Sequence, residues 1–299
     1  MATRDEQNRD VSLRKFSLDI RPLDLDLTLG CGQTFRWRKL PDGSWRGPVS
    51  DQLVTLKPNG KTVQALVKPG RRDADDLVSN YLRADDDIDR IQRVLGRDKI
   101  LARGMRDVRG LRIVKMDEWE CLVSYLLATF ANIPRISGMV ETLAGKYGKD
   151  IADGIKTFPR RAQLGKASER DLVRCGLGYR AGYLAELRDT VDDRRLEDLT
   201  RMDYRELRGE LLELPGVGEK VADCVSLFGF GKLEAFPIDV WMERALSRLY
   251  GQKGSYRRLR EFAGERFGQY AGYAQEYLYY NERLRFPRGE CCFSDKTRR

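Results

Sequence analysis

Residues 214–224 read LPGVGEKVADC, between one apolar helical pattern that ends near Leu214 and another that begins near Glu219. Proline fixes φ and glycine tolerates positive φ, so this Pro-Gly-x-Gly pattern predicts a tight hairpin between two helices. The backbone N–H groups of such a turn are free to bind a phosphate. The turn residues in question are Gly216, Val217 and Gly218.

Lys220 and Asp239 stand at two consecutive helix starts. Lys220 falls in the first turn after the hairpin, where the positive end of the helix dipole favours a free, nucleophilic amine over an ammonium. Asp239 is the expected N-cap of a third helix over 240–249, and a carboxylate fixed there can stabilise developing positive charge or deprotonate an amine. Singly, such a lysine is usually a solvated charge and such an aspartate only a cap. Together with the hairpin they predict a catalytic site.

The chain has 299 residues, 41% of them hydrophobic, which is enough for one large or two ordinary domains. Its 55 basic and 46 acidic residues give a net charge of +9, which favours a polyanionic partner, although charge alone leaves nucleic acid, ribosome and membrane surface open. No apolar run approaches the ~20 residues of a membrane helix, and the polar N-terminus lacks the apolar core of a signal peptide. We expect a monomer of the cytoplasm or nucleoid, or of the nucleus in a eukaryote, with no membrane partner.

The sequence contains no histidine. A Ser-His-Asp triad, a histidine-ligated zinc site and a histidine general base are thereby excluded, so catalysis must use Lys, Asp, Glu, Tyr or Cys. The cysteines show neither the C-x-x-C spacing of a zinc site nor the four-cysteine spacing of an iron–sulfur cluster. They stand at positions 31, 121, 175, 224, 291 and 292. We expect reduced thiols, no metal and no cofactor.

The spacing of apolar residues changes near residue 113. Before it, alternation with polar residues predicts half-buried strands, and Pro-Asp-Gly and Pro-Asn-Gly turns predict hairpins. The predicted strands cover 23–29, 35–38 and 63–67, and the predicted turns lie at 41–43 and 58–60. Helical patterns follow over 77–82 and 88–95, and from Trp119 onward the period is helical almost throughout.

These patterns predict an α+β fold. We expect an N-terminal α+β domain with an antiparallel sheet over residues 1–112. It should pack on a larger all-helical domain over 113–290, which is followed by a polar tail over 291–299.

Five ordered blocks resemble the helix-hairpin-helix-Gly/Pro-Asp superfamily of DNA glycosylases, and within it the 8-oxoguanine DNA glycosylases of the eukaryotic type. One block is the hairpin with its lysine and aspartate. The others are GQTFRW at 32–37, the segment 121–140 with RISGMV at its end, LGYRA at 177–181 and YAGYAQ at 270–275. The resemblance covers nearly the whole chain, whereas one such hairpin alone also occurs in non-catalytic DNA-binding proteins.

The resemblance implies a base-excision repair enzyme that binds double-stranded DNA containing oxidised guanine. It implies that the damaged nucleotide is flipped out, that Lys220 attacks the sugar C1′, and that the resulting Schiff base allows β-elimination 3′ to the lesion. The enzyme would be both a DNA glycosylase and an AP lyase. Related alkyl-base glycosylases have the aspartate without the lysine and are monofunctional.

The resemblance also assigns the base pocket. The carbonyl of Gly32 would accept a hydrogen bond from N7–H, which 8-oxoguanine has and guanine lacks. Cys224 and Tyr279 would stack on the two faces of the base, with Tyr279 in place of the usual phenylalanine, and Gln275 would contact the Watson–Crick edge. By periodicity alone, Cys224 is a core thiol and Gly32 marks a bulge.

Four residues occupy positions that fill the gap and hold the orphaned cytosine in the family, namely Asn132, Arg135, Tyr179 and Arg180. Without the family, surface solubility or a phosphate contact explains the two arginines equally well. The chain departs from the family at Phe130-Ala131, where asparagines are common, and at Trp241, which replaces a histidine. These departures bear on opposite-base preference, not on the chemistry.

Two alternatives stay open. A non-catalytic DNA-binding protein would use the hairpin and basic surface but would have no need for Lys220 together with Asp239. A glycosylase/lyase for another oxidised base would keep that pair, and the missing cluster cysteines argue against the endonuclease-III-like branch.

Overall fold

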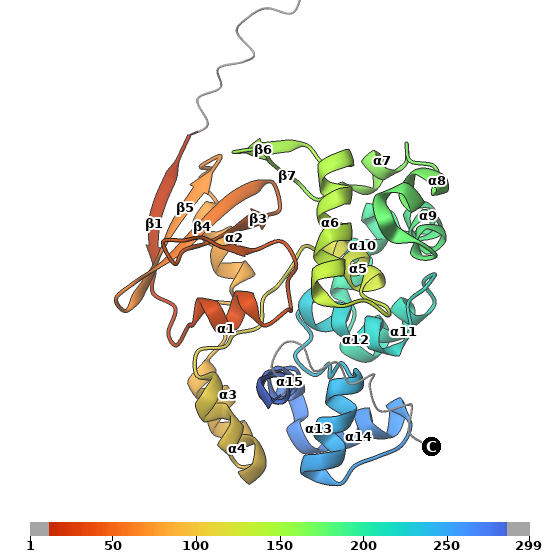
Figure 1. Cartoon of the computed structure of the whole chain (residues 1–299). Helices are drawn as coiled ribbons and strands as arrows, with labels where there is room; N and C mark the ends of the chain where they lie inside the picture. The colour runs from red at the N-terminus through yellow and green to blue at the C-terminus, as the bar shows by residue number, and fades with distance from the viewer. Residues whose placement is uncertain (1–11, 286–299) are drawn as a thin grey trace, which may run out of the picture.

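The computed structural model describes residues 12–285, shown in Figure 1. The predicted tail over 291–299 and its two cysteines lie outside the described residues. The N-terminal part is a five-stranded antiparallel sheet in the order β1-β5-β4-β3-β2. The strands are β1 (Arg14–Leu18), β2 (Arg38–Lys39), β3 (Trp45–Val49), β4 (Gln52–Asn59) and β5 (Thr62–Lys68).

The β4–β5 hairpin follows the predicted pattern. Val63, Ala65 and Val67 alternate with half-buried residues, and Leu56 pairs with Ala65 across the two strands. The turn between the strands contains Gly60 at φ 60°, a value that glycine adopts without a Cβ penalty. The strand predicted over 63–67 is therefore confirmed, as is the turn predicted at 41–43, whereas the turn predicted at 58–60 lies at Gly60 and Lys61 because Pro58 and Asn59 still pair in β4.

The strand predicted over 23–29 is wrong, because this segment contains the helix α1 (Leu25–Gly30). A run of alternate leucines includes pairs four residues apart, which also fit one face of a helix, and the buried residues of α1 are Leu25, Thr28 and Leu29, at i, i+3 and i+4. Asp24 decides between the two, since its side chain accepts from the N–H of Leu27 as an N-cap.

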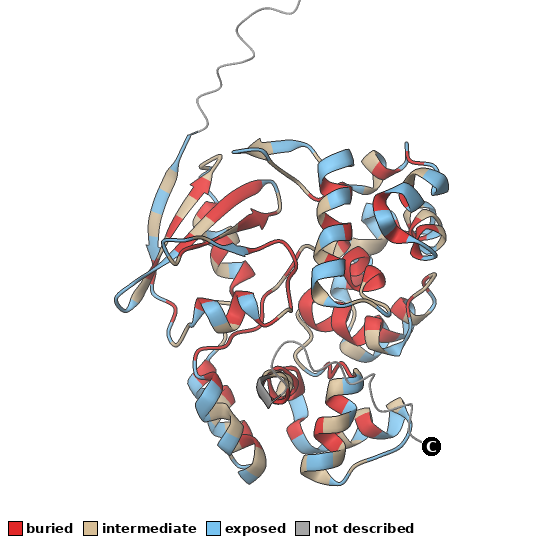
Figure 2. Ribbon diagram, viewed as in Figure 1, coloured by how far each residue is buried: buried red, intermediate tan, exposed pale blue. Residues whose placement is uncertain are grey.

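The strand predicted over 35–38 is wrong for most of its length, since only Arg38–Lys39 pairs, as β2. The side chains before it do not alternate between core and solvent. Phe35, Arg36 and Trp37 are all buried, because this segment runs between the sheet and the helices (Figure 2). Arg36 is held there by Glu141, 3.1 Å away, and by the carbonyl of Lys156.

The remainder is mostly helical, so the α+β fold class is confirmed. The helices are α2 (Ala74–Tyr81), α3 (Ile88–Leu95), α4 (Lys99–Met105), α5 (Glu118–Leu127), α6 (Ile133–Tyr147), α7 (Arg161–Leu164), α8 (Glu169–Leu172), α9 (Arg180–Thr190), α10 (Asp193–Arg201), α11 (Tyr204–Leu212), α12 (Glu219–Phe228), α13 (Val240–Tyr250), α14 (Tyr256–Phe267) and α15 (Ala271–Arg285). Three single turns, η2 (Arg106–Val108), η3 (Val173–Leu177) and η4 (Gly268–Tyr270), complete them.

One detail of the expected all-helical part is wrong. A two-stranded ribbon, β6 (Asp150–Ala152) and β7 (Ile155–Lys156), follows α6 and reaches toward the sheet (Figure 1). Its tight turn at Asp153 and Gly154 has positive φ at both residues, which matches the twist of a short hairpin.

The two parts share one apolar core. The buried apolar residues form a continuous cluster from the sheet through α5 and α12 to α15. α4 packs on α15 although it precedes it by some 170 positions in the chain, and α15 also packs on α13 (Figure 1). α15 is therefore fixed from both sides, and it can hold side chains in place between α12 and the N-terminal part.

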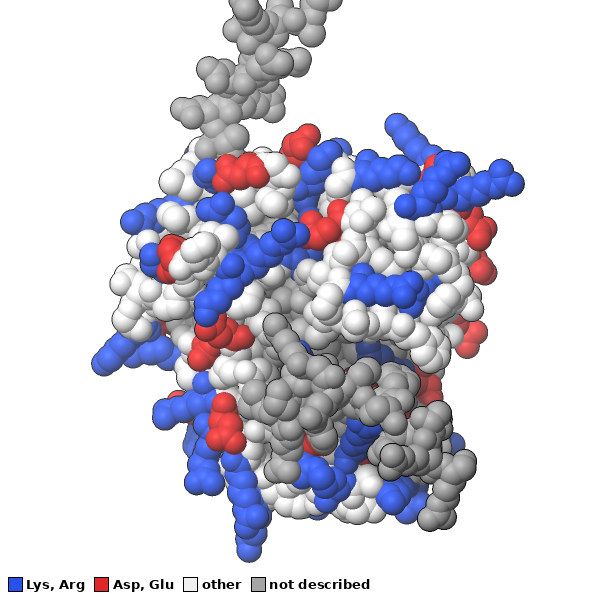
Figure 3. All heavy atoms as spheres, viewed as in Figure 1, with Lys and Arg blue, Asp and Glu red and all other residues white. Residues whose placement is uncertain are grey.

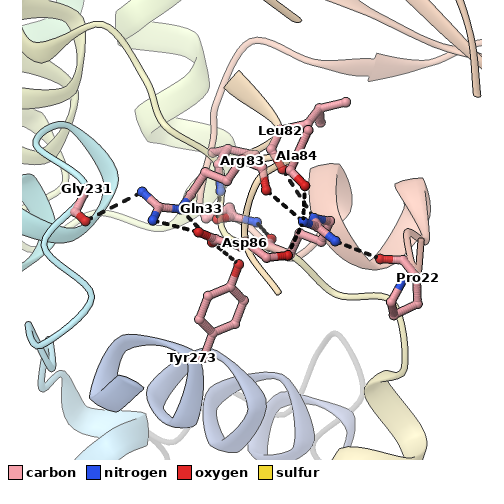
Figure 4. Close-up of polar contacts among 10 residues, drawn as sticks. Pro22, Gln33, Leu82, Arg83, Ala84, Asp86, Gly231 and Tyr273 are labelled. Atoms are coloured by element: carbon pink, nitrogen blue, oxygen red, sulfur yellow. Dashed lines mark hydrogen bonds and ion pairs between the residues drawn. The ribbon is translucent and has the colours of Figure 1, made fainter. Parts of the chain in front are cut away.

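A buried polar cluster braces the junction of the two parts (Figure 4). The Tyr273 hydroxyl donates to Asp86 at 2.5 Å, and Asp86 also pairs with Arg83 at 2.7 Å. Burial lowers the pKa of the Arg112 guanidinium, which donates to a ring of carbonyls. Those carbonyls belong to Pro22, Leu82, Arg83, Ala84 and Asp86. The Gln33 amide donates to the carbonyl of Arg112, which ties the segment beginning at Gly32 to this rigid centre.

Candidate active site

The hairpin between α11 and α12 depends on Gly216. This residue has φ +72°, and a Cβ there would lie 2.6 Å from the Tyr183 ring and 2.7 Å from Leu126, so only glycine fits. Gly218 is the N-cap of α12. Within residues 12–285 nothing accepts a hydrogen bond from the N–H of Gly216 or Gly218. The N–H of Val217, however, donates to Leu214, so the expectation that it is free is wrong, and the buried Val217 side chain anchors the turn.

Lys220 and Asp239 occupy the predicted helix starts. Lys220 is the second residue of α12, and Asp239 is the N-cap of α13, whose helix ends at Tyr250, one residue beyond the prediction. Asp239 Oδ1 accepts from the N–H groups of Trp241 and Met242, both at 3.0 Å. Burial raises the pKa of the Asp239 carboxyl, while the N–H of Met242 and the charge of Lys220 act in the opposite direction.

One cavity collects all six residues assigned by sequence to catalysis and base binding. They come from four separate parts of the chain: the segment after α1, helix α12, the N-cap of α13 and helix α15. The six are Gly32, Lys220, Cys224, Asp239, Gln275 and Tyr279. Gln33, Tyr125, Phe228, Pro237 and Glu276 complete the lining.

The backbone on either side of Gly32 is fixed by side chains. The Tyr125 hydroxyl donates to the carbonyl of Gln33 at 3.0 Å, and the Arg283 guanidinium donates to the carbonyl of Cys31. Gly32 itself has φ +100°, and a Cβ there would lie 2.4 Å from Ile133. Among the described residues none donates to the Gly32 carbonyl. The Gly32 carbonyl is therefore an acceptor without a partner among the described residues, on a backbone held on both sides.

Cys224, Gln275 and Tyr279 supply the other walls. Cys224 is buried one helical turn after Lys220, and burial raises its pKa to about 12, which makes it a thiol. Gln275 is buried, and its Oε1 has no hydrogen-bond partner among the described residues. The Arg283 guanidinium lies 5.6 Å from the centre of the Tyr279 ring, close enough to hold the ring by a cation–π contact.

The four residues assigned to the opposite strand lie together around the loop between α5 and α6, apart from the cavity lining. Asn132 caps α6 by accepting from the N–H of Arg135 at 3.0 Å, and both residues are exposed. The Tyr179 hydroxyl donates to the Thr129 carbonyl at 3.2 Å. Arg180 is 2% exposed and its guanidinium donates to the Thr129 carbonyl, so surface solubility does not explain this arginine, which supports the loop from inside.

Sequence reasoning assigned no role to Tyr125, Arg283 or Glu276, and it underrated Phe130. Tyr125 sits in an apolar helix and reads as core, and Arg283 lies beyond the recognised blocks. Glu276 did carry a signal, since it is a lone charge in the apolar stretch YAQEYLYY. Phe130 was noted only as a departure, yet it is 93% exposed at φ 51°, in the left-handed region that non-glycine residues seldom adopt.

Basic side chains are spread over one face of the molecule. On the face drawn in Figure 3, Lys and Arg side chains extend over both the sheet and the helical part, with acidic side chains between them. This distribution on that face fits long-range attraction of a polyanion.

Two features are absent from residues 12–285. No group of three or more His, Cys, Asp or Glu side chains in that part of the chain is arranged to hold a metal ion. Nor does that part contain a helix long and apolar enough to cross a membrane.

Comparison with known proteins agrees with this geometry. The family model described as "8-oxoguanine DNA glycosylase, N-terminal domain" matches residues 15–122. The N-glycosylase/DNA lyase of Arabidopsis thaliana is 31% identical, with 87% of this chain and 77% of that protein covered. A "probable N-glycosylase/DNA lyase" of Methanothermobacter thermautotrophicus is 34% identical over 62% of this chain and 68% of its own.

A solved structure extends the likeness to three dimensions. The 8-oxoguanine glycosylase/lyase of Clostridium acetobutylicum, in complex with double-stranded DNA that has cytosine opposite 8-oxoguanine, has a TM-score of 0.84 and 29% identity. The alignment covers 92% of this chain and 98% of that one. With the paired lysine and aspartate, the held Gly32 wall and relatives matched along most of their length, this chain belongs to the 8-oxoguanine DNA glycosylase/lyase family.

Proposed function

We propose that this protein excises 8-oxoguanine from double-stranded DNA and then cleaves the strand at the resulting abasic site. The observation that carries the proposal is one cavity that contains Lys220 and Asp239, each at a helix N-terminus, together with Gly32, whose carbonyl accepts no hydrogen bond within the described residues. In the same cavity, Cys224 and Tyr279 would contact the two faces of a flipped base. Glycosidic-bond chemistry needs a flipped nucleotide, since the target atoms are out of reach in the stack.

Lys220 is the proposed nucleophile. Its uncharged amine forms a bond to C1′ as the bond from C1′ to the base nitrogen breaks, and the base leaves with the bonding electrons and takes up a proton. The sugar ring then opens to a Schiff base, which acidifies C2′–H, and loss of that proton expels the 3′ phosphate. The Tyr125 ring, 5.0 Å from the Lys220 nitrogen, faces the cationic imine throughout.

Asp239 is the proposed electrostatic partner. Both of its capping hydrogen bonds go to Oδ1, and no described residue bonds to Oδ2. A carboxylate whose orientation is fixed in this way stabilises positive charge on the sugar without reorganising, and Oδ2 is free to take a proton from the Lys220 amine.

Recognition follows from the polarity of N7. In 8-oxoguanine N7 carries a hydrogen and donates to the Gly32 carbonyl, whereas in guanine N7 is an acceptor and faces that carbonyl with a lone pair. The bonds to Cys31 and Gln33 keep the Gly32 peptide from turning to suit guanine. A site whose acceptor needs a hydrogen bond from the substrate rejects an analogue that lacks the donor.

The loop between α5 and α6 is the proposed contact with the rest of the duplex. Asn132, Arg135 and Tyr179 would hold the orphaned cytosine, and the exposed Phe130 ring would fill the space that the flipped base leaves. The N–H groups of Gly216 and Gly218 would bind a backbone phosphate. We place the protein with the DNA, in the nucleoid or nucleus, and expect it to act as a monomer.

The test is release of the free base under single-turnover conditions. Four duplexes carry 8-oxoguanine opposite cytosine, 8-oxoguanine opposite adenine, guanine opposite cytosine, and an oxidised pyrimidine. We expect release of 8-oxoguanine, fastest opposite cytosine, followed by strand cleavage. Faster release of the oxidised pyrimidine would move the assignment to another lesion, and binding without release of any base would leave a DNA-binding protein.

A further inference from the structure

Glu276 is a buried carboxyl group in the active-site cavity that the mechanism above does not use. It is 4% exposed, follows Gln275 on α15 and lines the same cavity as Lys220 and Asp239. Its one hydrogen bond within the described residues comes from the Cys31 thiol, a weak donor, at 3.6 Å to Oε2. No ion pair to Glu276 is formed in that part of the chain.

The surroundings of Glu276 favour its neutral form. The Arg283 guanidinium donates to the Cys31 carbonyl, and the Lys220 side chain faces the Tyr125 ring, so neither forms an ion pair with Glu276. Burial raises the pKa of Glu276 to about 7, the Cys31 thiol and Arg283 lower it, and the Asp239 carboxylate raises it.

The remaining titratable neighbours do not alter this balance near neutral pH. The thiol of Cys224 and the hydroxyls of Tyr125 and Tyr279 also face the cavity, and burial raises the pKa of each, so all three stay uncharged.

We propose that Glu276 is a further lesion-contacting residue, whose neutral carboxyl donates a hydrogen bond to an exocyclic oxygen of the flipped oxidised purine. The inference rests on the proposed function, and it names a residue that contributes to the specificity of that function. It assigns to Glu276 the role of a specificity-determining donor beside Gly32.

The edge of 8-oxoguanine that carries N7 needs both an acceptor and donors from the protein. An 8-oxoguanine base presents its N7–H between two carbonyl oxygens, those on C6 and C8. If the Gly32 carbonyl accepts N7–H, both oxygens need donors from the same wall. Glu276 is bonded to Cys31, the residue next to Gly32, and so lies at this wall. A neutral acid there donates to such an oxygen, whereas a carboxylate would repel it.

The experiment is the pH dependence of 8-oxoguanine release by the wild-type protein, Glu276→Gln and Glu276→Leu under single-turnover conditions. Glutamine has nearly the same shape and keeps an N–H donor at every pH, whereas leucine has neither donor nor charge. Dividing the wild-type rate by the Glu276→Gln rate at each pH cancels every pH dependence that the two proteins share.

We expect this ratio to be constant below about pH 6 and to fall with rising pH above about 7, approaching a tenfold loss per pH unit as the carboxyl ionises. Glu276→Leu should be slower than Glu276→Gln by about tenfold at pH 6, the equivalent of one lost hydrogen bond. A ratio that does not change with pH, or one that rises as the carboxylate forms, would overturn the proposal.

An abasic-site duplex separates this inference from the chemistry. It has no base to contact, so the ratio of wild-type to Glu276→Gln strand cleavage should be independent of pH, whatever its absolute value. If the abasic ratio also falls above pH 7, Glu276 acts on the sugar chemistry and the proposed contact is wrong. If the wild-type protein releases no 8-oxoguanine at any pH, the proposed function fails first.

Discussion

The side-chain nitrogen of Lys220 lies 5.0 Å from the centre of the Tyr125 ring. The hydroxyl at the far end of that ring donates to the Gln33 carbonyl, one peptide from Gly32. A single side chain thus contacts the proposed nucleophile and fixes the proposed recognition wall. Because Tyr125 also stacks on Phe228 at 5.4 Å, its position is set by the core of α5 and α12.

Tyr125→Phe separates the two tasks. It keeps the ring beneath Lys220 and removes the donor to Gln33, so we expect Schiff-base formation at an abasic site to persist while preference for 8-oxoguanine over guanine falls. Leaving the buried carbonyl unpaired should lower the free energy of unfolding by about 1–3 kcal/mol. Single-turnover rates on both bases and a denaturant titration measure these effects. Undiminished preference would show that the hydroxyl does not hold the Gly32 wall.

Asp239→Asn separates the negative charge of the Asp239 side chain from its role as the N-cap of α13. Asparagine caps a helix as well as aspartate does, so the free energy of unfolding should change by less than about 0.5 kcal/mol, whereas Asp239→Ala should cost about 1 kcal/mol. Base release by Asp239→Asn should nevertheless fall by about 100-fold or more, because the carboxylate charge is lost. A fully active Asp239→Asn would reduce Asp239 to a structural cap.

Phe130→Ala tests the exposed ring on the loop between α5 and α6. Loss of base stacking should weaken binding to lesion duplex by about 1–3 kcal/mol without lowering thermal stability, because the ring touches little of the protein. Phe130→Gly should bind as weakly and be slightly more stable, since φ 51° suits glycine. Fluorescence anisotropy and thermal unfolding measure both. Unchanged affinity in both variants would remove Phe130 from the DNA interface.

Asp86→Ala tests the brace between the two parts of the chain. Asp86 joins Arg83 to Tyr273 on α15, and its loss leaves a partly buried guanidinium without its carboxylate. We expect a loss of about 3 kcal/mol in unfolding free energy, the size expected for hydrogen bonds to charged groups. Asp89→Ala, an exposed site on α3, is the matched control and should change stability little. Equal stability of the two variants would contradict the proposed brace.

The sequence correctly predicted those parts of the structure that a short segment determines by its own turn and capping residues. The hairpin with Gly216, the cap at Asp239 and the helix over 88–95 each carry their own turn or capping residues, and each forms as expected. The strand predicted over 23–29 failed because alternate leucines satisfy both periods and the decision rests on the cap at Asp24.

Most of the features that the sequence did not predict depend on contacts between residues that are far apart in the chain. Arg180 resembles a surface arginine until its guanidinium is seen to meet Thr129, 51 residues away. Tyr125 and Glu276 enter the site through bonds to the segment around Gly32, over separations of 92 and 245 residues. No local pattern encodes such contacts, and the assignment of Gly32 itself came from family resemblance.

The amine of Lys220 is central to the proposed mechanism, and borohydride reduction of the Schiff base tests its role most directly. A duplex with one 8-oxoguanine opposite cytosine is mixed with the wild-type protein, with Lys220→Gln, and with Lys166→Gln, in which an exposed lysine far from the cavity is changed. We predict a covalent protein–DNA band for the wild type and Lys166→Gln, and none for Lys220→Gln at equal binding. A band of undiminished strength in Lys220→Gln, or no band in the wild type despite base release, would contradict the lysine mechanism.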